Sequence, residues 1–271
     1  MPDNPLYLAW SKHDFGQKLW QETAPQLASI SEEYTTLDLS DNFLGNIAGT
    51  GLGDLCEAIP RTLEHLILRD NNLAFFASQR PALALDLARL PKLSSLNLGT
   101  NGLYRLSGEQ LKNLLGCFYS GLSQLDLSDN NLHHMHETDL GIGLSGLHKD
   151  IHSISLARNH FDFMEKKHLA FAIKNCPHSL LSMDLSNNDL TSDDIKNLLP
   201  AFQSSGIRSV NLSGNPVSDS VKADLQAILD TVRSKDSKST PTKRFHLWGS
   251  KGRSSDLMEI APLEKGPHSY L

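Results

Sequence analysis

The stretch LHHMHE, residues 132–137, contains three histidines and a glutamate. Its residue types favour metal binding more than those of any other part of the chain. Imidazole is a common ligand of transition metals. Paired histidine ligands on a helix usually stand four residues apart, however, and no matching set of Cys or His supports these three. Met135 falls at a spacing typical of buried residues, so His133, His134 and His136 are expected to lie on a loop. The sequence therefore predicts no metal and no cofactor, and an enzyme with a metal site on this loop is the least favoured function.

Other stretches that could carry catalysis are equally weak. The glycine-rich GTGLGD, residues 49–54, lacks both the Lys-Ser/Thr pair of a P-loop and the G-x-G-x-x-G spacing of a dinucleotide site. No G-x-S-x-G nucleophile motif occurs, and no pair of carboxylates stands out for acid–base work. The sequence therefore predicts a protein that is not an enzyme.

Composition narrows the possible partners and surroundings. The chain has 271 residues with a formal net charge of −6 and a pI near 6.0, which argues against nucleic acid as a partner. No apolar run approaches the roughly 20 residues that span a bilayer, so no membrane insertion is expected. The first residues lack a basic segment followed by an apolar one, which argues against a cleaved signal peptide. Scattered Cys56, Cys117 and Cys176 indicate reduced thiols, and the expected protein is a cytoplasmic monomer.

A template L-x-x-L-x-L-x-x-N-x-L recurs seven times and organises most of the chain. Two of the copies contain the same hexapeptide LDLSDN, at residues 37–42 and 125–130. The copies are 29, 30, 29, 29, 29 and 27 residues apart, which is too regular for chance. Their asparagines are Asn42, Asn71, Asn101, Asn130, Asn159, Asn188 and Asn215.

Each copy changes its hydrophobic period from strand to helix. Leu37 and Leu39 alternate, which predicts a short strand with one buried face. Leu111, Leu114 and Leu115 of the third copy fall on one face of a helix instead. Parallel strands lie about 4.8 Å apart and packed helices about 8–10 Å apart. We therefore predict an α/β fold, a curved solenoid (a horseshoe) with parallel strands on its concave face and helices on its convex face.

This template resembles the leucine-rich-repeat family over residues 34–233, and a period near 29 with a full helix is similar to its ribonuclease-inhibitor-like subclass. The resemblance implies that the repeat asparagines are structural, because a side-chain amide can bond the backbone of its own turn and of the next repeat. We expect these asparagines to form a ladder with no catalytic role.

The ends of the chain are expected to cap the repeats. Residues 1–33 would form an N-terminal cap of one degenerate repeat and a helix, which Pro25 could break. Residues 34–233 would hold the seven repeats. Residues 234–271 would contain a polar linker, a closing strand at FHLWGS (245–250) and a flexible tail.

Two candidate surfaces could bind a protein partner. The first is a mildly acidic concave face that would favour a basic partner surface, unless its Asp, Asn and Ser merely fill consensus positions. Its candidate residues are Asp38, Asp41, Arg69, Asp70, Asp126, Asp129, Arg158 and Asp184. The second is a set of loop residues three and four positions after the asparagines, unless they fold under to seal the core. These are Phe75, Tyr104, Arg105, His133, His134 and Phe163.

The alternation of buried and outward residues predicts that the carboxylates of Asp126 and Asp129 are free on the concave face. The sequence accordingly predicts that Asp126→Lys together with Asp129→Lys weakens partner capture while thermal stability hardly changes.

Three functions remain open at this point. The segments IPRTLEHLILRDNNL and CPHSLLSMDLSNNDLTSDDIKNLLPAF resemble leucine-rich-repeat effectors that intracellular bacteria such as Legionella deliver into host cells. That resemblance implies a non-catalytic module that binds a host protein, with a C-terminal type IV secretion signal in which Glu259 and Glu264 are candidates. The alternative is a cellular regulator of ribonuclease-inhibitor type that binds one dedicated enzyme, although the strands lack the Trp and Tyr anchors usual for tight binding. The third is the enzyme with a His-rich loop.

Overall fold

The computed structural model describes residues 7–15, 20–46, 57–74, 90–116 and 121–236. The chain divides into two units, residues 1–241 and 242–271, and all of the described residues belong to the first. The closing strand predicted at 245–250 and the predicted tail lie outside the described residues, as does Phe75.

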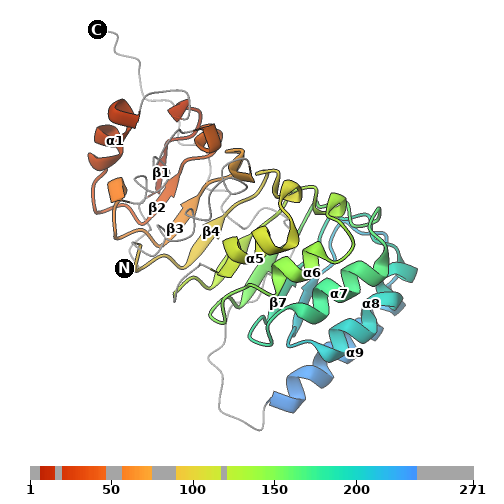
Figure 1. The fold of residues 1–271 in the computed structure, drawn as a ribbon. Coiled ribbons are helices and arrows are strands. Elements are labelled where there is room, and N and C mark those ends of the chain that lie inside the picture. Colours follow the sequence, from red (N-terminus) through yellow and green to blue (C-terminus); the bar gives the residue numbers. More distant parts are fainter. Residues whose placement is uncertain (1–6, 16–19, 47–56, 75–89, 117–120, 237–271) are drawn as a thin grey trace. The chain divides into compact units, whose positions relative to one another are not determined.

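The strands of the described residues form one open sheet of eight parallel strands, and their order in space is their order along the chain (Figure 1). Each strand is three residues long. The strands are β1 (Tyr7–Ala9), β2 (Thr36–Asp38), β3 (His65–Ile67), β4 (Ser95–Asn97), β5 (Gln124–Asp126), β6 (Ser153–Ser155), β7 (Ser182–Asp184) and β8 (Ser209–Asn211).

Neighbouring strands pair in a constant register. The central residue of each strand pairs with the central residue of the next, as Leu37 does with Leu66 and Leu96 with Leu125. A strand in the N-terminal segment continues the series, because Leu8 pairs with Leu37. The repeat spacing read from the sequence therefore corresponds to the spacing of strands in the sheet.

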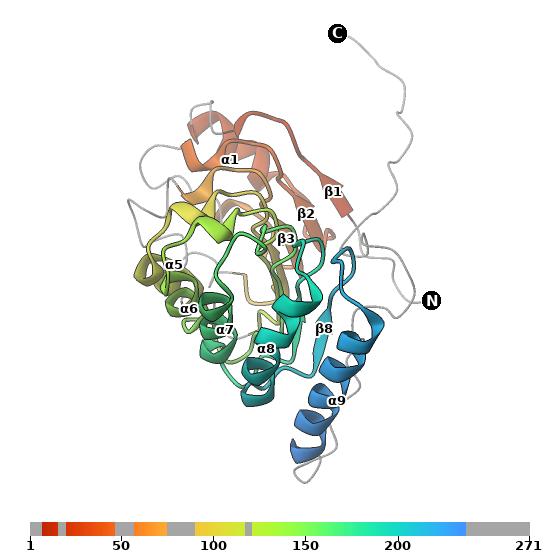
Figure 2. The same cartoon turned by 90° about the vertical axis from the view of Figure 1, so that its right-hand side faces the viewer.

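Helices cover one face of this sheet, and those between residues 108 and 236 stack side by side (Figures 1 and 2). Among the described residues they are α1 (Trp20–Ala28), α5 (Gly108–Gly116), α6 (Asp139–Leu144), α7 (Lys166–Asn175), α8 (Ser192–Ser204) and α9 (Asp219–Asp236). Three short 3₁₀ turns follow the strands: η2 (Leu44–Asn46), η3 (Leu103–Arg105) and η4 (Leu132–His134). Helix α1 runs through Pro25 without a break, contrary to the sequence expectation. Its buried Leu27 and Thr23 anchor both sides of the proline to the core, and this packing outweighs the lost backbone bond.

The core lies between the sheet and the helix layer. Leu111 and Leu115 of α5 and Leu37 and Leu39 of the first repeat are completely buried, as their spacing predicts. The largest fully buried side chains are Phe15, Phe161 and Phe202. Parallel strands on one face and helices on the other confirm the predicted α/β leucine-rich-repeat architecture. Within the described residues, no helix combines the length and apolarity needed to cross a bilayer.

The repeat asparagines connect each turn to its neighbours. The Oδ1 atom of Asn130 accepts from the backbone N–H groups of Asn101 (2.8 Å) and Leu103 (3.2 Å). Its Nδ2 donates to the carbonyls of Leu98 in the preceding repeat and Leu127 in its own, both at 3.0 Å. The bond from one asparagine's N–H to the next one's Oδ1, 2.7–3.0 Å long, joins Asn42, Asn71, Asn101, Asn130, Asn159, Asn188 and Asn215 in order.

The residue before each ladder asparagine has left-handed backbone, and so has the residue after each of the first six, with φ between 53° and 70°. Asn, Asp and Gly tolerate this conformation better than other residues, and β-branched residues tolerate it poorly. The residues before the asparagines are Asp41, Asp70, Thr100, Asp129, Arg158, Asn187 and Gly214, and those after them are Phe43, Asn72, Gly102, Asn131, His160 and Asp189. The abundance of Asp and Asn at these positions therefore has a backbone cause.

Thr100 is the residue least suited to this turn, and replacing it should stabilise the protein. Its φ is 55° and its buried hydroxyl has no hydrogen-bond partner. We expect Thr100→Asn to raise the free energy of unfolding by about 1 kcal/mol in urea denaturation, because Asn tolerates this backbone better. Asn187 holds the same position in another repeat at φ 53°, so Asn187→Thr should lower stability by a similar amount. Equal stability of both variants and the wild type would contradict this account.

Candidate functional site

The open sheet face is defined here by the last residue of each repeat strand, from Asp38 of β2 to Asn211 of β8, together with Asp41, Arg69, Asp70, Asp129 and Arg158 in the turns that follow the strands. Three of its aspartates use a carboxylate oxygen to accept the backbone N–H of the residue two positions later. Asp38 accepts from Ser40 at 2.9 Å, and Asp126 and Asp184 accept from their own Ser neighbours at 2.8 Å. Asn97 and Asn211 make the same bond through Oδ1. These last residues of the strands therefore stabilise the turns that follow, whether or not they also contact a partner.

Two of these aspartates are more enclosed than simple alternation suggests. Asp126 is 9% exposed and Asp184 is 6% exposed. Burial raises the pKa of the Asp126 carboxyl, while the hydrogen bonds from Ser128 and the charges of Arg69 and Arg158 oppose the rise. Asp38 is half-buried and accepts a 2.8 Å hydrogen bond from the hydroxyl of Tyr7.

The two arginines of this face are paired with one aspartate. Arg69 and Arg158 each place a guanidinium nitrogen 2.7–2.8 Å from the Oδ2 atom of Asp129. Arg69 passes beside Gly99 of the intervening repeat, where an added Cβ would lie 2.9 Å from its Nη1 atom. The two arginines therefore neutralise part of the negative charge that the sequence predicts for this face. Asp41 is half-buried and Asp70 is exposed.

The loop edge is a second surface, formed by Tyr104, Arg105, His133, His134, His160 and Phe163. Its rings lie close to one another: His133 is 3.9 Å from His134 and 5.6 Å from Phe163 between ring centroids. Tyr104 lies 5.5 Å from the His134 ring, and Arg105 lies over Tyr104 at 5.5 Å. Phe163 is 74% exposed, the most exposed large apolar side chain among the described residues.

His133 is held in place by the turn beneath it. Its Nδ1 lies 3.0 Å from the carbonyl oxygen of Asn159, and because a carbonyl can only accept, this nitrogen carries the proton. Burial lowers the pKa of His133, and the neighbouring His134 and His160 lower it further when charged, while the hydrogen bond to Asn159 and the charge of Asp162 oppose the fall. The net shift favours the neutral ring over the charged one.

A folded-state pKa below the unfolded value makes stability depend on pH in a definite direction. The unfolded chain takes up a proton at His133 first, so this stability is complete above about pH 6.5 and is lost as pH falls through the lowered folded value. We expect His133→Gln, which can still donate to Asn159, to lose less melting temperature between pH 7.5 and 5.5 than the wild type. The exposed His136 provides the control: His136→Gln should keep the wild-type dependence. Identical pH profiles for all three proteins would contradict this role for His133.

Sequence spacing did not identify His160, because it comes directly after the ladder asparagine of its repeat rather than three or four residues later. Its ring makes an edge contact with His133 at 5.5 Å between centroids. Ligand atoms of His160, Asp162 and Asp189 all lie within 4.8 Å of one another. Within the described residues, these three side chains are the group of His, Cys, Asp and Glu close enough together to bind one metal ion. The group does not include His134 or His136.

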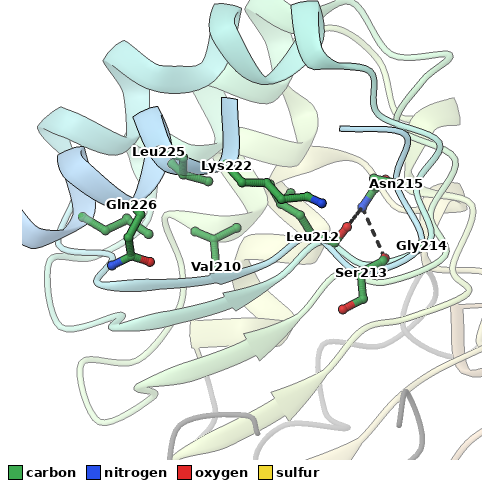
Figure 3. A pocket seen from close by; sticks show the side chains of 9 residues that line it. Val210, Leu212, Ser213, Gly214, Asn215, Lys222, Leu225 and Gln226 are labelled. Carbon is green, nitrogen blue, oxygen red and sulfur yellow. Dashed lines mark hydrogen bonds between the residues drawn. The ribbon is translucent and has the colours of Figure 1, made fainter. Parts of the chain in front are cut away.

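A hollow of about 360 Å³ lies at the end of the described sheet, between β8 and α9 (Figure 3). Its apolar lining is Val210, Leu212, Leu225 and Leu229. The side-chain amide of Asn215 donates to the carbonyls of Leu212 and Ser213, and Lys222 extends with its ammonium group directed toward Asn215 (Figure 3). Ser213 donates its hydroxyl to the amide oxygen of Asn211, which is not a base. Nothing in this hollow favours catalysis.

No known protein-family model and no curated protein sequence matches this chain. Among solved structures it is similar to the leucine-rich repeat-containing protein LegL7 from Legionella pneumophila, with a TM-score of 0.67 and 26% identity. The match covers 77% of this chain and 66% of LegL7, slightly less than two thirds of that protein. The C-terminal domain of tropomodulin from Caenorhabditis elegans is 12% identical over 54% of this chain and 87% of that domain; its TM-score of 0.38 is too low to support an inference.

Proposed function

We propose that this leucine-rich-repeat protein, which resembles a leucine-rich-repeat protein of Legionella, is a non-catalytic module that binds a partner protein through its loop edge. The observation that carries the proposal is the exposed Phe163, in ring contact with His133 and through it with His134 and Tyr104. Aromatic side chains flanked by Arg are enriched among the residues that dominate binding energy at protein interfaces. The Asn ladder below holds these loops in place, so little order would have to be gained on binding.

The open sheet face is the weaker candidate for the main contact. Asp126 and Asp184 are buried and bonded to backbone N–H groups, and Asp129 is paired with two arginines. A partner that displaced these bonds would leave buried groups without hydrogen bonds, which is costly. The more accessible Asp41, Asp70 and Arg158 are proposed as secondary contacts, consistent with a partner whose surface is basic in part.

The proposed partner is a host protein, and the protein is proposed to reach it as a bacterial effector. This part rests on the similarity to LegL7 and is tested separately from binding. Deletion of residues 252–271 should abolish translocation in a type IV secretion reporter assay and leave the melting temperature of the repeats unchanged. Normal translocation of the deleted protein would favour the alternative, a resident regulator of ribonuclease-inhibitor type that binds one dedicated enzyme.

Phe163 provides the test of the binding surface. We expect Phe163→Ser to lower partner capture from host-cell lysate at least tenfold, because truncating a central aromatic residue typically costs 2 kcal/mol or more, roughly a 30-fold loss in affinity. The matched control is Phe171 on α7, which is 38% exposed in the helix layer. Phe171→Ser should retain the same captured protein at wild-type yield. Equal capture by both variants would remove the loop edge from consideration.

A further inference from the structure

We propose that His160, Asp162 and Asp189 form a binding site for a divalent transition metal, with Zn²⁺ as the fitting ion. The site lies beside the loop edge, in the turns that follow β6 and β7. It goes beyond the proposed interaction function and does not depend on it. It also departs from the expectation of no metal, which considered only His133, His134 and His136.

The repeat geometry brings the three residues together. His160 and Asp189 hold the same position in consecutive repeats, directly after a ladder asparagine, with φ of 56° and 53°. The ladder bond from the N–H of Asn159 to the Oδ1 of Asn188, 2.7 Å long, fixes the distance between the two turns. The N–H of Asp162 donates to the carbonyl of Asn188 at 3.2 Å, which ties the third ligand to the same pair of turns. One nitrogen and two carboxylate oxygens are thereby placed within 4.8 Å of one another.

An unpaired oxygen supplies the second, independent observation. The Oδ1 atom of Asp162 is shielded from solvent, yet it has no hydrogen-bond partner in the structure. A buried polar atom without a partner is unfavourable, and a bound cation would remove that cost. The nearby ammonium group of Lys166 does not serve this oxygen, because it donates to the carbonyls of Phe161, Asp162 and Met164. A bound cation would satisfy the carboxylate of Asp162.

The ligand types select the class of metal. Ca²⁺ and Mg²⁺ prefer sites made entirely of oxygen, whereas Zn²⁺ readily combines imidazole nitrogen with carboxylate oxygen. Bonds of roughly 2.0–2.2 Å place neighbouring ligands of a tetrahedral ion about 3.4 Å apart. His160 and Asp189 are exposed, so small side-chain rotations can bring the ligand atoms from within 4.8 Å to this separation. Three protein ligands leave one position for water.

The structure also allows conservative variants for a binding test. His160 and Asp189 occupy left-handed positions, where Asn is well tolerated, and Asp162→Asn removes only the charge. The full-length protein, freed of metal with a chelator, would be titrated with zinc chloride by calorimetry, with magnesium chloride as the comparison ion. We expect saturable binding of one Zn²⁺ per chain and no binding of Mg²⁺ at the same concentrations. His160→Asn, Asp162→Asn and Asp189→Asn should each weaken zinc binding at least tenfold.

His136→Asn is the control, because His136 is an exposed histidine outside this group of ligands. It should bind zinc like the wild type, and melting temperatures would show that each variant is folded. The proposal is overturned if the wild type shows no saturable zinc binding, or if all three ligand variants keep the wild-type affinity. Loss of binding in His136→Asn with retention in the three variants would also overturn it, because the ion would then sit elsewhere on the His-rich loops.

Discussion

Asn130→Ala should lower the free energy of unfolding by about 4 kcal/mol, since it leaves several buried backbone groups without partners at once. The Asn130 side chain accepts from the N–H groups of Asn101 and Leu103 and donates to the carbonyls of Leu98 and Leu127, all within 3.2 Å. The residue is completely buried, so water cannot replace these bonds. Urea denaturation monitored by circular dichroism measures the loss.

Asn113 on α5 gives the matched control for this substitution. Its side chain is exposed, and Asn113→Ala should change stability by less than about 0.5 kcal/mol. A loss at Asn130 no larger than that at Asn113 would mean that the asparagine ladder contributes little to the stability of the repeats.

The second large effect is expected at Asp126. Asp126→Lys should destabilise the protein by about 3 kcal/mol, because it buries an ammonium group and removes the acceptor of the Ser128 N–H. The new positive charge would also stand close to Arg69 and Arg158, whose charges act on the Asp126 carboxyl. This differs from the sequence expectation that the double charge reversal at Asp126 and Asp129 hardly affects thermal stability.

Asp126→Asn separates the two roles of this side chain. Asn97 and Asn211 make the equivalent bond elsewhere in the column, so the variant keeps its acceptor and should lose less than about 1 kcal/mol. Thermal denaturation of the pair of variants distinguishes the outcomes. A Lys variant as stable as the Asn variant would show that this position is open to solvent and available to a partner.

Much of the fold follows from periodicity alone. Because the strands pair at a constant register, the sequence spacing of Leu37, Leu66 and Leu96 translates directly into neighbouring positions in the sheet. The helical period likewise identifies the buried Leu111 and Leu115. A prediction from a repeated pattern is robust because every copy indicates the same local structure. One imperfect copy therefore does not change the predicted fold.

The roles of the polar residues were harder to predict, since they depend on distances between repeats and on backbone torsion. Arg69 reaches Asp129 across a full repeat and passes close to Gly99 of the repeat between them, a relation that no single copy of the template contains. The bond from Asp126 to Ser128 could have been inferred from the D-x-S pattern, which occurs again at Asp38 and Ser40. Strand alternation instead indicated that these carboxylates were free.

The group of ligands beside the loop edge escaped prediction for a related reason. His160, Asp162 and Asp189 come from two repeats, and their letters are separated by most of a repeat in the sequence. Comparing the column directly after each ladder asparagine would have placed His160 beside Asp189. The unpaired oxygen of Asp162, in contrast, is a property of burial and could be recognised only in three dimensions.

Hydrogen exchange of the full-length protein, measured with and without its captured partner, is the decisive test of the loop edge as the binding surface. We expect slower exchange in the loops of residues 103–105, 132–134 and 160–163, with little change on the outer faces of α7 and α8. Protection confined to those helices, with unchanged exchange in the three loops, would contradict it.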